Sequence, residues 1–245
     1  MAHMYRFTHE AVTVVATQDQ EELLSTAVPA EISLSSLTMF CAILFMNEFR
    51  KVGMDSVDVA KTCNMSEWRR RLYRGAATAG EEDDDIMDLP PKPVSRSGQI
   101  YATTSAEETS GKESFNAFLF VHHRPSLAKT IPSTGASGNS TSASPASLSP
   151  EAQDLVALKG ATHIWLCGSD PEQRRHHLMS KCLDRVEQDV RDWKASGEGS
   201  GVLCVHTIPQ AFPAMIQFLI KNGFQGGERI IGGENGKVLY WKQVA

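Results

Sequence analysis

The chain has 245 residues, of which 41% are apolar, and a formal net charge of −5. This length suits one large domain or two small ones, and the apolar share is enough for a hydrophobic core without disulfides or metals. The acidic balance argues against nucleic-acid binding as the main function, so we expect a small molecule or a protein as the partner and leave the oligomeric state open.

The five cysteines are an odd number without a CxxC pair, and several lie in apolar runs, where cysteine behaves as a small hydrophobic residue. No opening segment has the order of charged, apolar and small residues that marks a secretory signal, and residues 1–4 are typical of a cloning remnant. The sequence therefore predicts reduced thiols and a cytoplasmic protein.

Residues 1–75 show mostly helical patterns, at about 18–28, 34–51 and 56–74. The most apolar run, 37–46, has about half the length that a membrane-spanning helix needs. Serines precede it and basic residues follow it, as at the start and the end of a helix. We expect a buried helix here and no membrane partner.

Two segments are predicted to be flexible loops rather than parts of the core. Residues 76–98 contain an acidic run and a proline cluster, and residues 129–150 are almost wholly small and polar. The acidic run is interpreted as solvated rather than metal-binding. Between the loops, the aromatic and branched residues of 115–124 predict a strand, with 99–105 as a weaker neighbouring strand.

The segment from 158 to 245 has the clearest pattern. Residues 161–167 predict a buried strand, and Asp170-Pro171 predicts a turn into a helix. Apolar residues then recur at spacings of three and four, which predicts an amphipathic helix. These positions are Met179, Cys182, Leu183, Val186, Val190 and Trp193.

Glycines and serines in 196–201 end this helix, and 202–208 is predicted to be the next strand. A short apolar helix follows from near Pro213 and closes at Asn222-Gly223, with glycine in the left-handed position. Two β-like runs within 226–244 predict a hairpin.

This order of elements resembles the C-terminal half of the GCN5-related N-acetyltransferases (GNATs). The resemblance is carried by 164-IWLCGSDPEQRRHHL-178, where that family has a strand, an Asp-Pro turn and a Q/R-x-x-G-x-G/A loop, and by 214-AMIQFLIKNGF-224, where it has a helix ending in Gly-Phe. It covers roughly residues 99–245. It implies one α/β domain over 1–245, with a mixed, mostly antiparallel sheet flanked by helices and two disordered insertions.

The resemblance implies that the turn after 161–167 holds the pyrophosphate of acetyl-CoA. Backbone amides at a helix N-terminus favour a diphosphate, and glycine lets the backbone approach it closely. Strands 161–167 and 202–208 would splay apart to admit the pantetheine arm. The implied cofactor-binding residues are Leu166, Cys167, Gln173, Arg174, Arg175, His176, His177 and Leu178.

The turn departs from the family motif because it has no glycine. With Arg174 at the first motif position, the two glycine positions fall on His177 and Met179. With Gln173 at the first position, they fall on His176 and Leu178. The arginines could supply charge in place of amides. The tyrosine that many members use as the acid toward the departing thiolate falls on Leu219, which has no hydroxyl.

Three histidines are candidate catalytic residues, because an amine must lose a proton before it attacks a thioester. His206 closes strand 202–208, with a hydrogen-bonded core or rim histidine as the structural alternative. His122 and His123 close strand 115–124, and adjacent strand residues face opposite sides, so at most one faces a given site. Adjacent histidine pairs chelate poorly, and no metal site is predicted.

Two functions remain open. The first is an acyl-CoA-dependent N-acyltransferase that acts on a small amine or a protein amine. The second is a GNAT-like protein that has lost acetyl transfer and uses the cleft for another small-molecule reaction or for binding alone. The sequence does not identify the acceptor.

Overall fold

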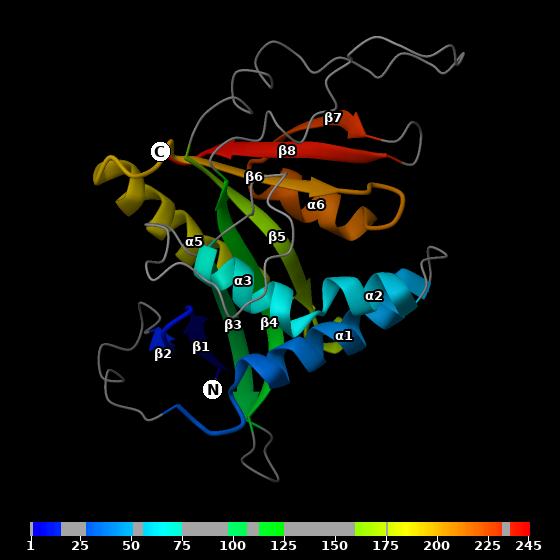
Figure 1. Cartoon of the computed structure of the whole chain (residues 1–245). Coiled ribbons are helices and arrows are strands. Elements are labelled where there is room, and N and C mark those ends of the chain that lie inside the picture. Colours follow the sequence, from blue (N-terminus) through cyan, green and yellow to red (C-terminus); the bar gives the residue numbers. More distant parts are fainter. Residues whose placement is uncertain are drawn as a thin grey trace. The chain divides into compact units, whose positions relative to one another are not determined.

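Figure 1 shows the fold in a computed structural model. The structure describes residues 2–15, 28–50, 56–74, 98–106, 113–124, 160–174, 176–231 and 236–245. The chain divides into two compact units. The first comprises residues 1–77, 81–123 and 164–188, and the second comprises residues 78–80, 124–163 and 189–245.

The first unit opens with an antiparallel pair of strands, β1 (Ala2–Phe7) and β2 (Val12–Val15). β1 also pairs with β3 (Gln99–Ala106), which pairs with β4 (Glu113–Arg124). The N-terminal part was expected to be mostly helical, and β1 and β2 show that this expectation was wrong for residues 2–7 and 12–15. β1 includes three of the four residues interpreted as a cloning remnant, and its strand conformation depends on pairing with β3, which lies far along the chain.

In the described residues, β2 is followed by α1 (Leu34–Arg50), α2 (Ser56–Thr62) and α3 (Met65–Arg74). The predicted helix 34–51 is confirmed as α1. Its start is capped reciprocally. The Ser33 hydroxyl accepts from the Ser36 backbone N–H at 3.2 Å, and the Ser36 hydroxyl accepts from the Ser33 N–H at 3.0 Å.

The single helix expected over 56–74 is two helices, because the chain turns at Cys63 and Asn64. The Asn64 side chain accepts from the Ser66 backbone N–H at 2.9 Å and so caps α3. Asparagine competes with the helical backbone in this way, which is why the break falls here.

α1 is buried on one face only, which corrects the expectation of a buried helix. Leu37 and Cys41 are fully buried, and Leu44 and Phe45 nearly so. On the other side, the apolar residues Met39, Ile43 and Met46 are exposed.

Aromatic rings form the core of the first unit. Phe118 of β4 packs between α1, through Phe40 and Phe45, and α3, through Trp68. Phe120, two residues along β4, meets Trp68 edge-on at 5.4 Å between ring centroids. This contact fixes α3 against the strands.

β5 (Ala161–Ser169), a short 3-10 turn η3 (Pro171–Gln173) and α5 (Leu178–Ala195) follow one another. The strand and the amphipathic helix were both predicted. Pro171, however, opens η3 and not α5, which starts only at Leu178. The buried face of α5 includes Cys182, Leu183 and Val186, as the spacing predicted.

The second unit contains β6 (Val202–Thr207), α6 (Pro213–Lys221), β7 (Gln225–Ile231) and β8 (Lys237–Gln243). β8 pairs antiparallel with both β6 and β7, so the predicted hairpin is confirmed. α6 is followed by Gly223 with a φ of 79°, the left-handed conformation predicted from the Asn-Gly sequence.

The strand order is β2-β1-β3-β4-β5-β6-β8-β7 in an eight-stranded sheet, and β5 contributes residues to both units. The strand pairs β1–β2, β1–β3, β3–β4, β6–β8 and β7–β8 are all antiparallel. This agrees with the predicted α/β fold, in which helices flank a mostly antiparallel sheet. The single-domain organisation stays a prediction.

The predicted loops 76–98 and 129–150 lie outside the described residues, apart from Gly98. The predicted helix 18–28 also lies outside them, apart from Val28. Among the helices of the described ranges, none is long and apolar enough to cross a membrane.

Candidate functional site

β5 departs from regular strand alternation between Trp165 and Gly168. The Trp165 ring lies 5.1 Å from that of Phe120, centroid to centroid. A Cβ on Gly168 would meet the side chains of Leu44 and Phe118. Phe118 and Phe120 share one face of β4, so Trp165 and Gly168 also face one side although they are three residues apart. A regular strand would place them on opposite sides, so β5 holds an extra residue here, as in a β-bulge.

The residues within this irregularity, Leu166 and Cys167, are half-buried, whereas the first four residues of β5 are buried. Burial of the Cys167 thiol raises its pKa to about 12, so it stays protonated at neutral pH. These two predicted cofactor-binding residues therefore lie where β5 becomes accessible.

The turn after β5 is fixed by two short hydrogen bonds. The Asp170 backbone N–H donates to the Asn116 carbonyl of β4 at 2.7 Å. The Asp170 side chain accepts from the Glu172 N–H at 2.9 Å and so caps η3, where Pro171 is the first residue. These two hydrogen bonds fix the direction in which the chain leaves the end of β5.

Arg174 follows η3 and forms an ion pair with Glu48 of α1, with Nη2 and Oε1 3.0 Å apart. Its side chain is 45% exposed, so the pair is screened by solvent and adds little stability. The carboxylate nevertheless offsets the charge that was expected to attract a phosphate. Glu48 is a residue of this site that the sequence did not indicate.

His177 is the only non-glycine residue in the described part of the chain with a positive φ, at 57°. It stands directly before α5, and its carbonyl accepts from the Lys181 N–H at 3.0 Å. His176 and His177 are exposed, Gln173 is half-buried and Leu178 is buried in the first turn of α5. Arg175 lies outside the described residues.

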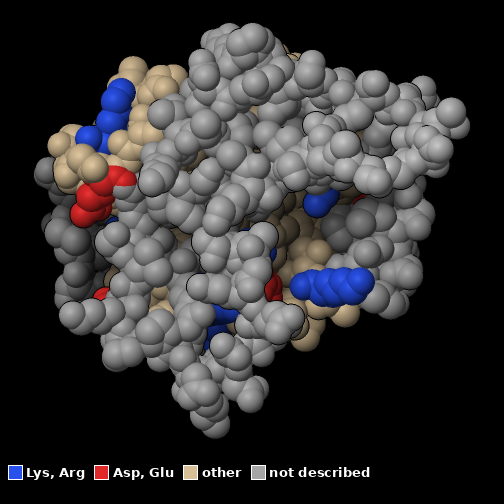
Figure 2. All heavy atoms as spheres, turned by 45° about the horizontal axis from the view of Figure 1, so that its top comes forward, with Lys and Arg blue, Asp and Glu red and all other residues tan. Residues whose placement is uncertain are grey.

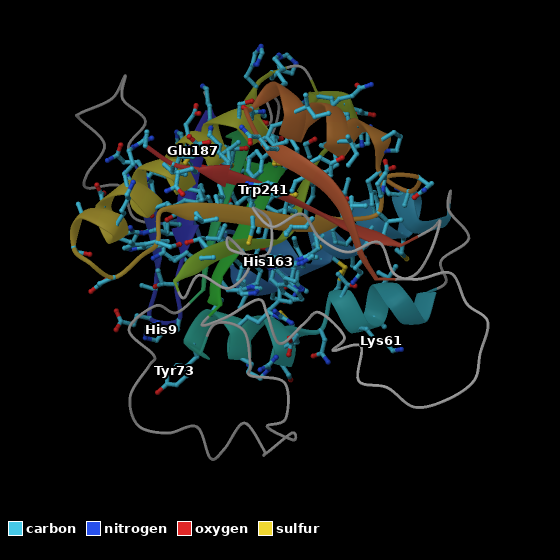
Figure 3. The ribbon with its side chains drawn as sticks, turned by 90° about the horizontal axis from the view of Figure 1, so that it is seen from above. His9, Lys61, Tyr73, His163, Glu187 and Trp241 are labelled. Carbon is cyan, nitrogen blue, oxygen red and sulfur yellow. The ribbon has the colours of Figure 1, made fainter. Side chains whose placement is uncertain are left out.

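His206 of β6 is half-buried and hydrogen-bonded to another histidine. Its Nδ1 lies 2.7 Å from Nε2 of His163, a β5 residue that is 3% exposed and labelled in Figure 3. One ring must donate and the other accept, so each fixes the tautomer of its partner. Sequence reasoning did not single out His163, which looked like one more residue of a buried strand.

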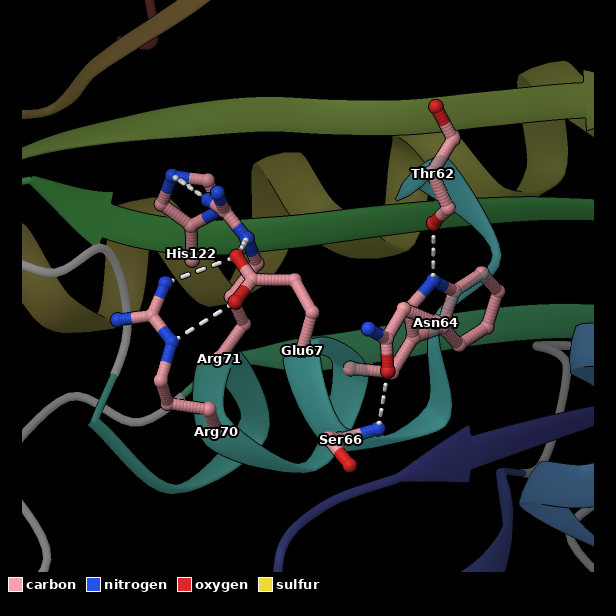
Figure 4. A network of polar contacts seen from close by, with 8 residues as sticks. Thr62, Asn64, Ser66, Glu67, Arg70, Arg71 and His122 are labelled. Atoms are coloured by element: carbon pink, nitrogen blue, oxygen red, sulfur yellow. Dashed lines mark hydrogen bonds and ion pairs between the residues drawn. The ribbon is translucent and has the colours of Figure 1, made fainter. Parts of the chain in front are cut away.

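His122 is enclosed in a polar network of the first unit (Figure 4). It is 1% exposed, and its Nε2 lies 3.5 Å from Nη1 of Arg71. The Arg71 guanidinium also stacks 4.0 Å from the Trp165 ring centroid. These contacts are those of a packed core histidine, and its catalytic role stays a prediction. The His123 side chain lies outside the described residues.

The comparisons with known proteins agree with this arrangement at the level of the fold. No family model matches the sequence, and no curated protein matches it. Among solved structures, PaiA N-acetyltransferase from Thermoplasma acidophilum in complex with coenzyme A matches 99% of this chain and 99% of its own, with a TM-score of 0.52 and 8% identity. The chain has the GNAT fold.

Two further GNAT-family acetyltransferases are similar in structure. The one from Staphylococcus aureus Mu50 matches 90% of this chain and 98% of its own, with a TM-score of 0.47 and 12% identity. The one from Listeria monocytogenes 4b F2365 matches 89% and 92%, with a TM-score of 0.47 and 13% identity.

Within the GNAT fold, the backbone favours one of the two motif registers. The register that starts at Arg174 places a glycine position on His177, and His177 has the left-handed backbone that glycine adopts most readily. The register that starts at Gln173 would place that glycine on His176 instead. The turn thus retains a glycine-like backbone without a glycine.

The helix α6 lacks a phenol at the GNAT tyrosine position. Leu219 is 1% exposed and holds that position with an apolar side chain. A hydroxyl placed there would be buried. Protonation of a leaving thiolate by this residue is therefore excluded.

Figure 2 shows the charges on one face of the molecule. Among the described residues visible there, basic and acidic side chains are interspersed, and no large patch of one sign is seen. The absence of a nucleic-acid partner stays a prediction.

Proposed function

We propose that this chain binds an acyl-CoA at the turn between β5 and α5 and transfers the acyl group to an amine. The observation that carries the proposal is the left-handed backbone of His177 directly before the N-terminus of α5. This geometry turns the chain so that the first amides of α5 can face an anion, and the helix dipole favours negative charge there. PaiA N-acetyltransferase, which has this fold, is in complex with coenzyme A.

The residues of the turn fit a diphosphate in two ways. The N–H groups of the first turn of α5 have no partner within the helix and can donate. Arg174 adds a guanidinium, although Glu48 holds it at 3.0 Å. A diphosphate would have to share Arg174 with this carboxylate, which predicts modest affinity.

A bound acyl-CoA would supply the acyl group as a thioester open to attack by an amine. The attacking nitrogen loses one proton, and we assign its acceptance to His206. With Nδ1–H donating to His163, His206 presents its Nε2 lone pair as the base. Because Leu219 cannot donate a proton, the thiolate leaves unprotonated or takes a proton from water.

Calorimetric titration with acetyl-CoA tests the binding. We expect measurable binding that weakens in Arg174→Ala and tightens in Glu48→Gln, because the second variant frees the guanidinium and removes a competing negative charge. Lys237→Ala, an exposed cation of the second unit, is the matched control and should leave the affinity unchanged. No heat of binding at millimolar acetyl-CoA would contradict the proposal.

Release of free coenzyme A thiol, followed with a panel of small amines and amine-bearing peptides, tests the transfer. His206→Ala should lower the turnover number with little change in acetyl-CoA affinity, and His163→Gln should shift the pH profile of turnover. Unchanged turnover in His206→Ala would remove His206 as the base.

A second candidate function is acyl-CoA binding without transfer, which the buried, hydroxyl-free Leu219 favours. The two candidates differ in one result. Acetyl-CoA binding without thiol release for any amine would support binding alone.

A further inference from the structure

Cys41 and Cys63 form a pair of thiols that the proposed acyl transfer does not use. Their Sγ atoms lie 3.6 Å apart. Cys41 comes from the middle of α1, and Cys63 from the link between α2 and α3. A disulfide has an S–S distance of about 2.05 Å, so the sulfurs need to approach by roughly 1.5 Å to form one.

The backbone on both sides of Cys63 is held in place. The Trp68 indole N–H donates to the Thr62 carbonyl at 2.8 Å. The Thr38 hydroxyl of α1, which donates to the Leu34 carbonyl at 2.7 Å, also contacts Met65 Sδ at 3.0 Å. The link is thus fastened to α3 on one side and to α1 on the other, which keeps the two sulfurs together.

The two thiols differ in exposure and acidity. Cys41 is fully buried, and burial raises its pKa far above the usual range. Cys63 is half-buried, and its contact with Cys41 lowers its pKa despite the opposing effect of partial burial. Cys63 is therefore the thiol that a reagent reaches first and the one that ionises more readily.

The other cysteines with a shifted pKa behave differently. Burial raises the pKa of Cys182 to about 12, as it does that of Cys167. Burial keeps both of these thiols protonated, so a disulfide reagent is expected to react first at Cys63, whose pKa is lowered.

We propose that Cys41 and Cys63 are a redox-modification site. A small disulfide such as oxidised glutathione oxidises the two thiols to a reversible disulfide within the chain. The Cys63 thiolate attacks one sulfur of the reagent, which breaks its S–S bond, forms a mixed disulfide and releases one thiolate. The Cys41 sulfur then attacks the Cys63 sulfur and releases the second thiolate, which takes up the Cys41 proton. Two electrons pass from the protein to the reagent, which leaves as two thiols.

The disulfide would tie α1 to the α2–α3 link. α1 also carries Glu48, which holds Arg174 of the candidate site. The oxidation itself does not depend on acyl transfer, so its test is independent of the proposed function.

The test uses the full chain in buffers with increasing ratios of oxidised to reduced glutathione. Free thiols are counted after denaturation, and crosslinked peptides are mapped by mass spectrometry. We expect two of the five free thiols to be lost, and the crosslinked peptides to contain Cys41 and Cys63. The reductant dithiothreitol should restore both.

Variants separate the two steps of the oxidation. Cys63→Ser should lose no thiol, whereas Cys41→Ser should retain glutathione on Cys63 as a mixed disulfide. Cys182→Ser, which removes a buried thiol of α5, is the control and should still form the crosslink. The proposal would be overturned if all five thiols persisted in a buffer that oxidises a small dithiol, or if the crosslink joined other cysteines. Both outcomes are measured on the wild-type chain and do not depend on the folding of a variant.

Discussion

His177 adopts a backbone conformation that costs most L residues about 1–2 kcal/mol, although histidine tolerates it better than most. His177→Gly removes this cost but adds about 0.5–1 kcal/mol of unfolded-chain entropy. We expect the two effects to offset nearly completely. Lys181→Gly, at an exposed position inside α5, carries only the entropy and should lose about 0.5–1 kcal/mol. Urea unfolding of both variants measures the difference, and a less stable His177→Gly would contradict the conformation.

Gly168 is the point where α1 touches the backbone of β5, because a Cβ there would meet Leu44. Its φ is not positive, so the cost of Gly168→Ala is steric, and we expect about 1–3 kcal/mol of destabilisation. Leu44→Ala alone should cost about 2–4 kcal/mol, since Leu44 is buried.

A double-mutant cycle separates this contact from general damage. The cavity left by Leu44→Ala accepts the new methyl group, so the double variant should be more stable than the sum of the single effects by at least about 1 kcal/mol. Additive effects in urea unfolding would mean that Gly168 does not face Leu44.

Among the elements, α3 carries an ion-pair network that makes stability depend on pH. Glu67 accepts from Arg70 at 2.8 Å and from Arg71 at 2.5 Å. Burial raises the pKa of Glu67, but the hydrogen bonds and charges of the two arginines outweigh it and hold this pKa below its usual value. The ion pairs of Glu67 therefore add their full contribution to the free energy of unfolding above pH ~4.3, the usual pKa of glutamate. This contribution is lost as the pH falls through the lower pKa of Glu67 in the folded state.

Glu67→Gln removes this contribution. The stability difference between wild type and variant, measured by urea unfolding, should shrink as the pH falls from about 6 to about 3. Glu198→Gln, at an exposed position after α5, controls for the loss of one surface charge. Parallel curves for wild type and Glu67→Gln would contradict a lowered pKa.

The elements that the sequence predicted well are those whose pattern is local. α5 shows its buried face by spacing alone, and α6 ends at an Asn-Gly pair with a defined backbone. β1 could not be found in this way, because Tyr5 gains its strand partner from Ala102, almost a hundred residues later. The break at Cys63 also escaped notice, since both flanking segments are helical.

At the scale of the whole molecule, the features of the candidate site that depend on neighbouring residues were predicted, and those that depend on distant residues were not. The position of the turn after β5 was predicted, because the strand, turn and helix adjoin in sequence. The contacts that define its chemistry join distant residues: Arg174 and Glu48 are 126 residues apart, and His163 and His206 are 43 apart. Such pairs arise only from the folded topology, so neither Glu48 nor His163 could be read from a local pattern.

The proposed disulfide has a consequence for global stability that a thiol count does not measure. Cys41 and Cys63 are 22 residues apart, and closing a loop of this size lowers the entropy of the unfolded chain, which corresponds to about 3 kcal/mol in the chain-entropy description. Because the sulfurs are already close in the folded chain, little opposing strain is expected. The oxidised protein should unfold at higher urea than the reduced protein, and Cys63→Ser should not respond to oxidation.

Both cysteines belong to the first unit, so the gain should appear there. Backbone amides of α1 and α3 should exchange hydrogen more slowly after oxidation, whereas those of β6 and β8 in the second unit serve as the internal reference. An oxidised protein that is less stable than the reduced one would show that the folded chain must distort to form the bond, and the thiol pair would then be a packing contact without a redox role.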